Sequence, residues 1–269
     1  MICDTHTHSM YSFDGVETIA AMCATAVSKG IQVLAVTDHT EVLTSKEMGD
    51  SERRRLREHR EAVMEAQKLY AGKLKLLYAC ELGQPQFNPA WAEEMAQYPF
   101  DMVIGSIHFK KGDIDLYDVT YTRENRDECI HEYFEETKEM IRQGGFHTLG
   151  HLDYILRRME GCFDGKPGYT IYREQVDEIL SMLIERDIAL EVNTAGLRKW
   201  LSALIEQWIL ERFRTLGGKY ITIGSDAHVK EDIGAGFAEA AKLIRAAGFS
   251  EIVYFEKGQP VSVPLKGEV

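Results

Sequence analysis

Two histidines one residue apart stand near the start of this chain, in the segment DTHTHS at residues 4–9. On a β-strand, residues i and i+2 project from the same face, so His6 and His8 are predicted to point toward one place. Two imidazoles directed at one point are a candidate metal site, because imidazole is a common ligand of zinc and other transition metals. The pair alone does not separate a metal site from a surface strand, so the other residues decide.

Six of the nine histidines lie at or just after the predicted end of a strand, and they are His6, His8, His39, His108, His151 and His228. Carboxylates accompany them: Glu81 ends an apolar run, and Asp226 lies two residues before His228. A carboxylate at the end of a buried strand is costly unless it is paired or binds a metal. Glu81 is therefore a candidate bridging ligand, with an ion pair to an arginine as its alternative.

The set of candidate ligands contains imidazoles and carboxylates but no thiolate, which favours Zn, Mn or Fe(II). It also holds more donors than one tetrahedral ion needs. We therefore predict more than one divalent ion. Such ions, held about 3.5 to 4 Å apart, are typical of phosphoryl transfer.

The elements that position these residues follow from the hydrophobic pattern, in which short apolar runs alternate with longer amphipathic segments. Predicted strands lie at residues 4–6, 31–39, 74–81, 101–108, 147–151, 188–193 and 220–228. Predicted helices lie at residues 17–29, 51–70, 91–97, 123–142, 172–186, 201–216 and 236–247. This order predicts an α/β fold with a closed or nearly closed parallel barrel, whose strand ends open on one face. The six histidines would gather on that face.

No linker or shift in composition divides the chain, which predicts one domain over residues 1–269. The loop-like segment at residues 163–169 is interpreted as an active-site loop. Residues 251–269 are expected to add a last strand or a tail. The histidines at positions 59, 131 and 147 fall outside the strand ends and are interpreted as ordinary structural or surface residues.

Composition excludes several classes of protein. A hydrophobic content of 45% in 269 residues is enough for a sizeable core, and no run of about 18 apolar residues or signal-peptide pattern is present. We therefore expect no membrane partner and a cytoplasmic location. The net charge of -12 disfavours nucleic acid as a partner. The five cysteines form no C-x-x-C pair, which predicts reduced thiols.

Taken in order, the motifs resemble those of the polymerase and histidinol phosphatase (PHP) superfamily. They are D-x-H-x-H at 4–8, T-D-H at 37–39, Glu81, S-x-H at 106–108, G-H-x-D at 150–153 and S-D-A-H at 225–228. Within the superfamily the sequence is similar to the monofunctional histidinol-phosphate phosphatases. The resemblance implies a distorted (β/α)7 TIM-like barrel that holds three divalent ions.

The resemblance also implies three sets of metal ligands. The first is His6, His8, Glu81 and Asp226; the second is Glu81, His108 and His151; the third is Asp14, His39 and His228. Asp14 stands where the superfamily often has histidine, and a turn residue before Gly15 is its alternative interpretation.

Substrate recognition and proton transfer are left open among several residues. Guanidinium groups match phosphate oxygens in a bidentate geometry, and the candidates are Arg157, Arg158 and Arg198, the last in a segment where the resemblance implies a phosphate-binding arginine. The candidates for the general acid are Asp226, Asp153 and His228. The substrate that the resemblance implies, histidinol phosphate, carries an imidazole and an ammonium group. These groups would pair with acidic residues, for which the candidates are Glu41, Asp113 and Asp115.

The leading hypothesis is therefore a metal-dependent phosphomonoesterase that hydrolyses L-histidinol phosphate by attack of a metal-bridging hydroxide. One alternative is a PHP phosphoesterase with another monoester substrate, such as a nucleotide, a sugar phosphate or phosphotyrosine. A non-catalytic metal-binding module is another. A polymerase-associated nuclease is disfavoured by the acidic charge and by the missing polymerase domains.

Overall fold

A parallel sheet that curves into a nearly closed barrel forms the centre of the computed structural model, which describes residues 2–199 and 205–265. The strands lie side by side in the order β1-β2-β4-β5-β8-β9-β10, and β3 pairs with β4 beyond β2. Their bounds are Cys3–Asp4 (β1), Val33–Val36 (β2), His39–Glu41 (β3), Lys75–Gly83 (β4), Met102–Ser106 (β5), Thr148–Leu149 (β8), Ala189–Asn193 (β9) and Ile221–Gly224 (β10). The predicted α/β barrel with seven strand positions is confirmed.

Backbone hydrogen bonds between the first and last strands bring the two edges of the sheet together. Thr5 N donates to Ile223 O at 3.0 Å, and Asp226 N donates to His6 O at 2.8 Å. The segments after β1 and β10, which carry several candidate ligands, therefore lie side by side.

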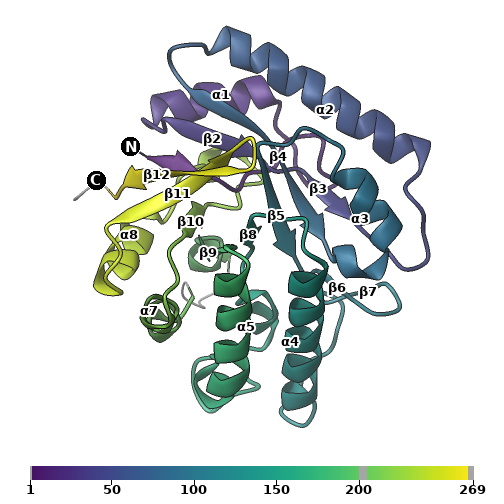
Figure 1. The fold of residues 1–269 in the computed structure, drawn as a ribbon, viewed down its shortest axis with the longest axis vertical. Helices are drawn as coiled ribbons and strands as arrows, with labels where there is room; N and C mark the ends of the chain where they lie inside the picture. Colours follow the sequence, from purple (N-terminus) through teal and green to yellow (C-terminus); the bar gives the residue numbers. More distant parts are fainter. Residues whose placement is uncertain (1, 200–204, 266–269) are drawn as a thin grey trace.

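Helices surround the strands (Figure 1). Their bounds are Ile19–Ser28 (α1), Asp50–Leu69 (α2), Pro89–Met95 (α3), Arg126–Gln143 (α4), Arg173–Glu185 (α5), Gly196–Lys199 (α6), Gln207–Leu216 (α7) and Phe237–Ala246 (α8). All except the short α6 were predicted, and residues 201–204 of the predicted helix at 201–216 lie outside the described residues. Four 3-10 turns complete the connections at Pro85–Phe87 (η1), Tyr154–Arg158 (η2), Thr170–Tyr172 (η3) and Lys230–Asp232 (η4).

The burial of side chains in the structure accounts for the hydrophobic pattern of the sequence. All four residues of β2 are buried, as expected for a parallel strand covered on both faces. On α2, Leu56, Val63 and Ala66 form the buried face, while most of the other residues face solvent. None of the helices in residues 2–199 and 205–265 combines the length and apolar character that a membrane span needs. All five cysteines are free thiols.

The C-terminal segment forms a hairpin of β11 (Glu251–Glu256) and β12 (Gln259–Pro264), where only one strand or a tail was expected. Gly258 N donates to Asp101 O at 2.9 Å, and the rings of Phe255 and His147 lie 5.1 Å apart. Asp101 and His147 directly precede β5 and β8, so the hairpin covers the N-terminal end of the barrel (Figure 1).

Residues 163–169, which the sequence analysis interpreted as an active-site loop, pack against neighbouring segments of the chain. The Arg126 guanidinium lies over the Phe163 ring at 4.7 Å, and the buried Tyr169 donates its hydroxyl to Leu152 O at 2.9 Å. The segment packs beside α4 and the turn after β8, and none of its residues lines the cavity described below. Glycine and proline predicted a loop, but they do not specify which segments the loop packs against.

Candidate metal centre

The six histidines predicted from strand ends meet at the C-terminal end of the barrel. They follow or begin five different strands, β1, β3, β5, β8 and β10. Neighbouring rings are close: the centroids of His8 and His39 lie 4.3 Å apart, and those of His8 and His228 lie 4.2 Å apart. Residues far apart in the sequence therefore present their imidazoles to one volume.

Glu81 on β4 lies at the centre of this group, with 1% of its surface exposed. The distances from its two carboxylate oxygens are 2.8 Å to His151 Nε2, 3.3 Å to His108 Nε2, 3.2 Å to His6 Nε2, 3.5 Å to His8 Nε2 and 3.0 Å to His39 Nδ1. Both oxygens face imidazoles, which is the arrangement expected of a bridging ligand.

The other members of each predicted ligand set lie close together as well. Asp226 Oδ1 is 3.4 Å from His8 Nε2 and 3.8 Å from His6 Nε2. His108 Nε2 and His151 Nε2 are 3.3 Å apart. Asp14 Oδ2 is 2.9 Å from His228 Nε2 and 3.7 Å from His39 Nε2. The structure brings together the residues of all three predicted sets.

The chemistry of these donors fits divalent metal ions. The buried atoms His6 Nε2, His8 Nε2 and His39 Nδ1 have no hydrogen-bond partner within the described residues. A buried polar atom without a partner is costly, and a metal ion would satisfy these lone pairs. Groups of three or four imidazoles and carboxylates in metal-binding proximity support bound metal ions at this site.

The charges of the buried side chains also fit bound metal ions. Burial opposes ionisation of Glu81, but His6, His39 and His108 outweigh it and hold its pKa well below the usual range. Burial likewise disfavours a charged His39, but the carboxylates around it, with Glu81 foremost, raise its pKa to about 10. The buried carboxylates thus demand positive charge, which is supplied by protons or, in competition with them, by metal ions.

Two carboxylates lie behind the histidines. On β9, Glu191 Oε1 is 2.7 Å from His6 Nδ1. On β3, Glu41 Oε1 is 2.8 Å from His108 Nδ1, and Gln84 Nε2 donates to Glu41 Oε2 at 2.6 Å. Glu191 was missed by the sequence analysis, although a lone carboxylate within the apolar strand IALEVN was a usable signal. Glu41 was considered only for the substrate.

The motif residues Asp4 and Asp38 hold the loops that carry the histidines. Asp4 accepts hydrogen bonds from Ser225 N at 2.9 Å and Gly234 N at 2.8 Å. Asp38 accepts from Ser9 N at 2.6 Å, and the buried His59 Nε2 lies 3.2 Å from it. These carboxylates tie the ends of β1, β2 and β10 together, and His59 has the structural role predicted for it.

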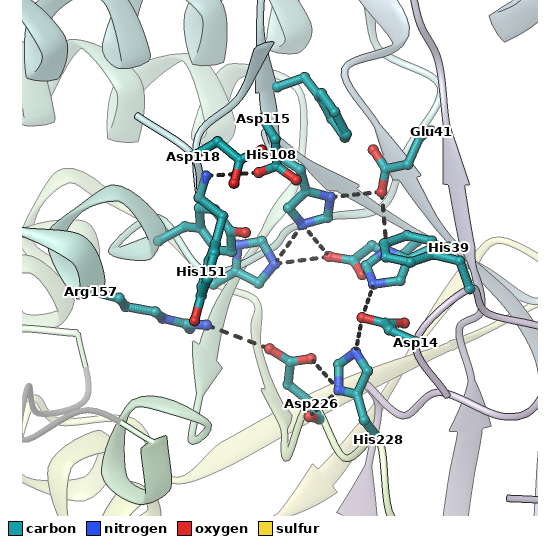
Figure 2. A pocket seen from close by; sticks show the side chains of 15 residues that line it. Asp14, His39, Glu41, His108, Asp115, Asp118, His151, Arg157, Asp226 and His228 are labelled. Atoms are coloured by element: carbon teal, nitrogen blue, oxygen red, sulfur yellow. Dashed lines mark hydrogen bonds and ion pairs between the residues drawn. The ribbon is translucent and has the colours of Figure 1, made fainter. Parts of the chain in front are cut away.

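A cavity of about 360 Å³ opens above the histidines, within the size range of small-molecule sites. Of the three candidate arginines, Arg157 lines it, opposite His39 and Glu41 (Figure 2). Arg158 is exposed and lies over the Tyr117 ring at 4.0 Å. Arg198 donates to Ser225 O at 2.6 Å and does not line the cavity.

The structure also distinguishes among the three candidates for the general acid. Asp226 and His228 line the cavity, whereas Asp153 lies behind Arg157, with its Oδ2 3.8 Å from the arginine Nε. Asp226 has a φ of 54°, a left-handed conformation that non-glycine residues adopt mainly at sites where the surroundings enforce it.

Among the acidic residues considered for the substrate, Glu41 and Asp115 line the cavity together with Asp118, which was missed. Asp113 instead accepts hydrogen bonds from Thr44 N and Ser45 N at 2.7 and 3.0 Å, and so joins two segments that are far apart in the sequence. Asp118 follows a short hairpin of β6 (Phe109–Lys110) and β7 (Ile114–Asp115), which the sequence analysis did not foresee.

Known proteins are similar to this chain in sequence and in fold. The chain is 30% identical to the histidinol-phosphatase of Lactococcus lactis over 260 residues, which are 94% of this chain and 93% of that protein. It is also 30% identical to a probable histidinol-phosphatase of Clostridium acetobutylicum over 265 residues, covering 96% of this chain and 98% of that protein.

The crystal structure of histidinol phosphate phosphatase from Lactococcus lactis, complexed with zinc, L-histidinol and phosphate, superimposes with a TM-score of 0.81 at 26% identity. The match covers 97% of this chain and 98% of that one. Residues 4–195 match the sequence family described as the PHP domain. With the barrel and the clustered histidines, these matches establish that the chain belongs to the PHP family.

Proposed function

We propose that this chain is a phosphomonoester hydrolase whose substrate is L-histidinol phosphate, which it converts with water to L-histidinol and phosphate. The observation that carries the proposal is the convergence of six imidazoles and three carboxylates below a cavity that Arg157 also lines. Of these imidazoles, Figure 2 labels the ones that line the cavity, His39, His108, His151 and His228. The relatives named histidinol-phosphatase, and the similar structure that holds L-histidinol and phosphate, support this substrate.

The metal centre in this proposal contains three divalent ions of zinc, manganese or iron. Their ligands are His6, His8, Glu81 and Asp226; Glu81, His108 and His151; and Asp14, His39 and His228. When bound, such ions supply a nucleophile at neutral pH and neutralise charge on phosphoryl oxygens.

Arg157 would bind the phosphate. Its side chain is 2% exposed, its Nη2 donates to Asn193 Oδ1 at 3.1 Å, and its Nη1 lies 3.6 Å from Asp226 Oδ2. These contacts hold the guanidinium beside the candidate ligands. There it would bind two phosphoryl oxygens and stabilise their charge while the ester bond breaks.

The rim of the cavity suits a cationic leaving group. Asp115 and Asp118 line it, and so do the aromatic rings of Phe13 and Tyr117, which are 76% and 45% exposed. Carboxylates and aromatic faces both attract cations, such as the ammonium and the protonated imidazole of histidinol. An anionic leaving group would meet two carboxylates at the same place.

The leaving alkoxide requires a proton. Asp226 and His228 lie on the cavity wall and are also proposed metal ligands, so either would hold a water that delivers the proton. Asp153 then serves to hold Arg157 rather than to donate a proton.

A substrate panel tests the proposal. Phosphate release from L-histidinol phosphate is compared with that from a nucleotide, a sugar phosphate and a phosphotyrosine peptide, each after chelation and after addition of Zn²⁺ or Mn²⁺. We expect metal-dependent turnover with a kcat/KM for L-histidinol phosphate several orders of magnitude above the others. Similar slow rates across the panel would indicate a PHP phosphoesterase of another specificity, and no turnover would favour a metal-binding module.

A further inference from the structure

Glu191 contacts two candidate metal ligands and is sealed from the cavity. It lies on β9, is 1% exposed and is not among the residues that line the cavity. Its Oε1 is 2.7 Å from His6 Nδ1, and its Oε2 accepts a hydrogen bond from His151 N at 2.8 Å. One carboxylate therefore contacts the imidazole of one ligand and the backbone of another.

Both hydrogen-bonding partners of Glu191 Oε2 are N–H donors. They are His151 N and Asn193 Nδ2, and the second donates at 3.2 Å. An ionised carboxylate only accepts, so the short contact with His6 Nδ1 requires a proton on that nitrogen. The lone pair of the neutral ring is then on Nε2, the atom that faces Glu81 and Asp226 without a hydrogen bond.

The close approach of the two side chains depends on Gly224 of the neighbouring strand β10. A Cβ atom at that position would lie 2.3 Å from His6 Cβ and 2.4 Å from Glu191 Oε1. Such distances are far shorter than van der Waals contact. The fold therefore leaves space here for the imidazole and the carboxylate to meet.

We propose that Glu191 is a positioning residue that holds His6 with Nδ1 protonated and Nε2 directed at the metal, and so sets the metal affinity of the centre. The inference rests on the proposed function in one respect, that the centre binds metal. Carboxylates behind a metal-bound imidazole fix its tautomer and orientation, and their loss weakens metal binding by about 10- to 100-fold.

The test measures Zn²⁺ affinity by competition with a chromophoric chelator, using chelator-treated full-length protein and no substrate. In E191Q, a single amide oxygen replaces the two carboxylate oxygens that accept hydrogen bonds. The amide NH₂ group then faces at least one N–H donor without being able to accept its hydrogen bond. We expect Zn²⁺ binding weaker by about 10- to 100-fold. The matched control is E136Q, since Glu136 is 8% exposed and accepts a hydrogen bond from Gln86, away from the histidines. We expect E136Q to bind as the wild type does.

A second readout needs no variant. In the Zn²⁺-loaded wild type, long-range ¹H–¹⁵N correlation of the His6 ring should show a proton on Nδ1 and metal on Nε2. The opposite tautomer would overturn the proposal even if E191Q fails to fold, and so would a folded E191Q with wild-type Zn²⁺ affinity. A wild type that binds no Zn²⁺ would instead overturn the proposed function.

Discussion

The two ends of the barrel differ in the polarity of their buried side chains. At the C-terminal end His6 and His8 are completely buried and Glu81 is 1% exposed, so polar groups occupy positions that elsewhere hold the core. At the N-terminal end the hairpin of β11 and β12 presents apolar side chains, and Ile252 and Phe255 are each 3% exposed. Both ends are buried, but only one is apolar.

This difference separates stability from function. Buried apolar surface stabilises the fold by about 25 cal/mol per Å². Buried imidazoles and carboxylates oppose folding until protons or metal ions balance their charge. Substitutions at the histidine end should therefore change metal binding and catalysis, and substitutions at the hairpin end should change the free energy of unfolding. The four predictions below test this separation.

The largest effect is expected for Glu81→Ala, because this carboxylate lies within 3.5 Å of His6, His8, His39, His108 and His151. We expect kcat/KM for L-histidinol phosphate to fall by about 10³-fold or more, with loss of bound Zn²⁺. Metal content by mass spectrometry and initial rates measure both. Full activity in a metal-loaded variant would contradict the assignment of Glu81 as a metal ligand.

At the opposite end, Phe255→Ala removes a buried ring between the hairpin and the start of β8. We expect a loss of about 3 kcal/mol in the free energy of unfolding, measured by urea titration. Zn²⁺ affinity and kcat/KM should match the wild type at a temperature where the variant is folded. A variant of normal stability but altered activity would break the separation.

Arg157→Ala should reduce kcat/KM by about 10²-fold through loss of phosphate binding. The neighbouring Arg158→Ala is the matched control, since Arg158 is exposed and lies over Tyr117. We expect it to remain within a few-fold of the wild type. Zn²⁺ affinity should be retained in both variants, and a larger effect from Arg158 would reverse the assignment.

The smallest effect concerns His147 at the hairpin end. Its Nδ1 accepts a hydrogen bond from Val103 N at 2.9 Å, and burial lowers the pKa of the ring. The unfolded chain, with the ordinary pKa near 6.5, then binds more protons than the folded protein as pH falls below that value. This contribution to stability is present above pH 6.5 and is lost on acidification.

His147→Asn places an amide oxygen near the acceptor position without a titrating group. Urea titrations of metal-free wild type and variant at pH 7.5 and pH 5 should show a smaller pH-dependent loss in the variant. Equal losses would show that His147 does not contribute.

Much of the site could be predicted because the relevant rules are local. The two-residue period of a strand places His6 and His8 on one face, and the parallel barrel brings the ends of its strands together. The parallel barrel, the six histidines at its strand ends, Glu81 and Asp226 followed from the pattern of the sequence, whereas Asp14 came from the resemblance to the PHP superfamily.

Other features depended on packing between distant segments. Glu191 meets His6 only because β9 and β1 both adjoin β10, where Gly224 leaves space. The packing of residues 163–169 beside α4 depends on contacts such as that of the Arg126 guanidinium with the Phe163 ring.

The two neighbouring arginines show most directly what the sequence alone could not decide. Arg157 and Arg158 share the 3-10 turn η2, in which successive side chains are about 120° apart. The sequence determined that two adjacent arginines follow the candidate ligand His151, and since adjacent residues on such a turn point in different directions, at most one of them faces inward. Only the packing of η2 against Asn193 and Asp226 decided that it is Arg157, because that contact links segments far apart in the chain.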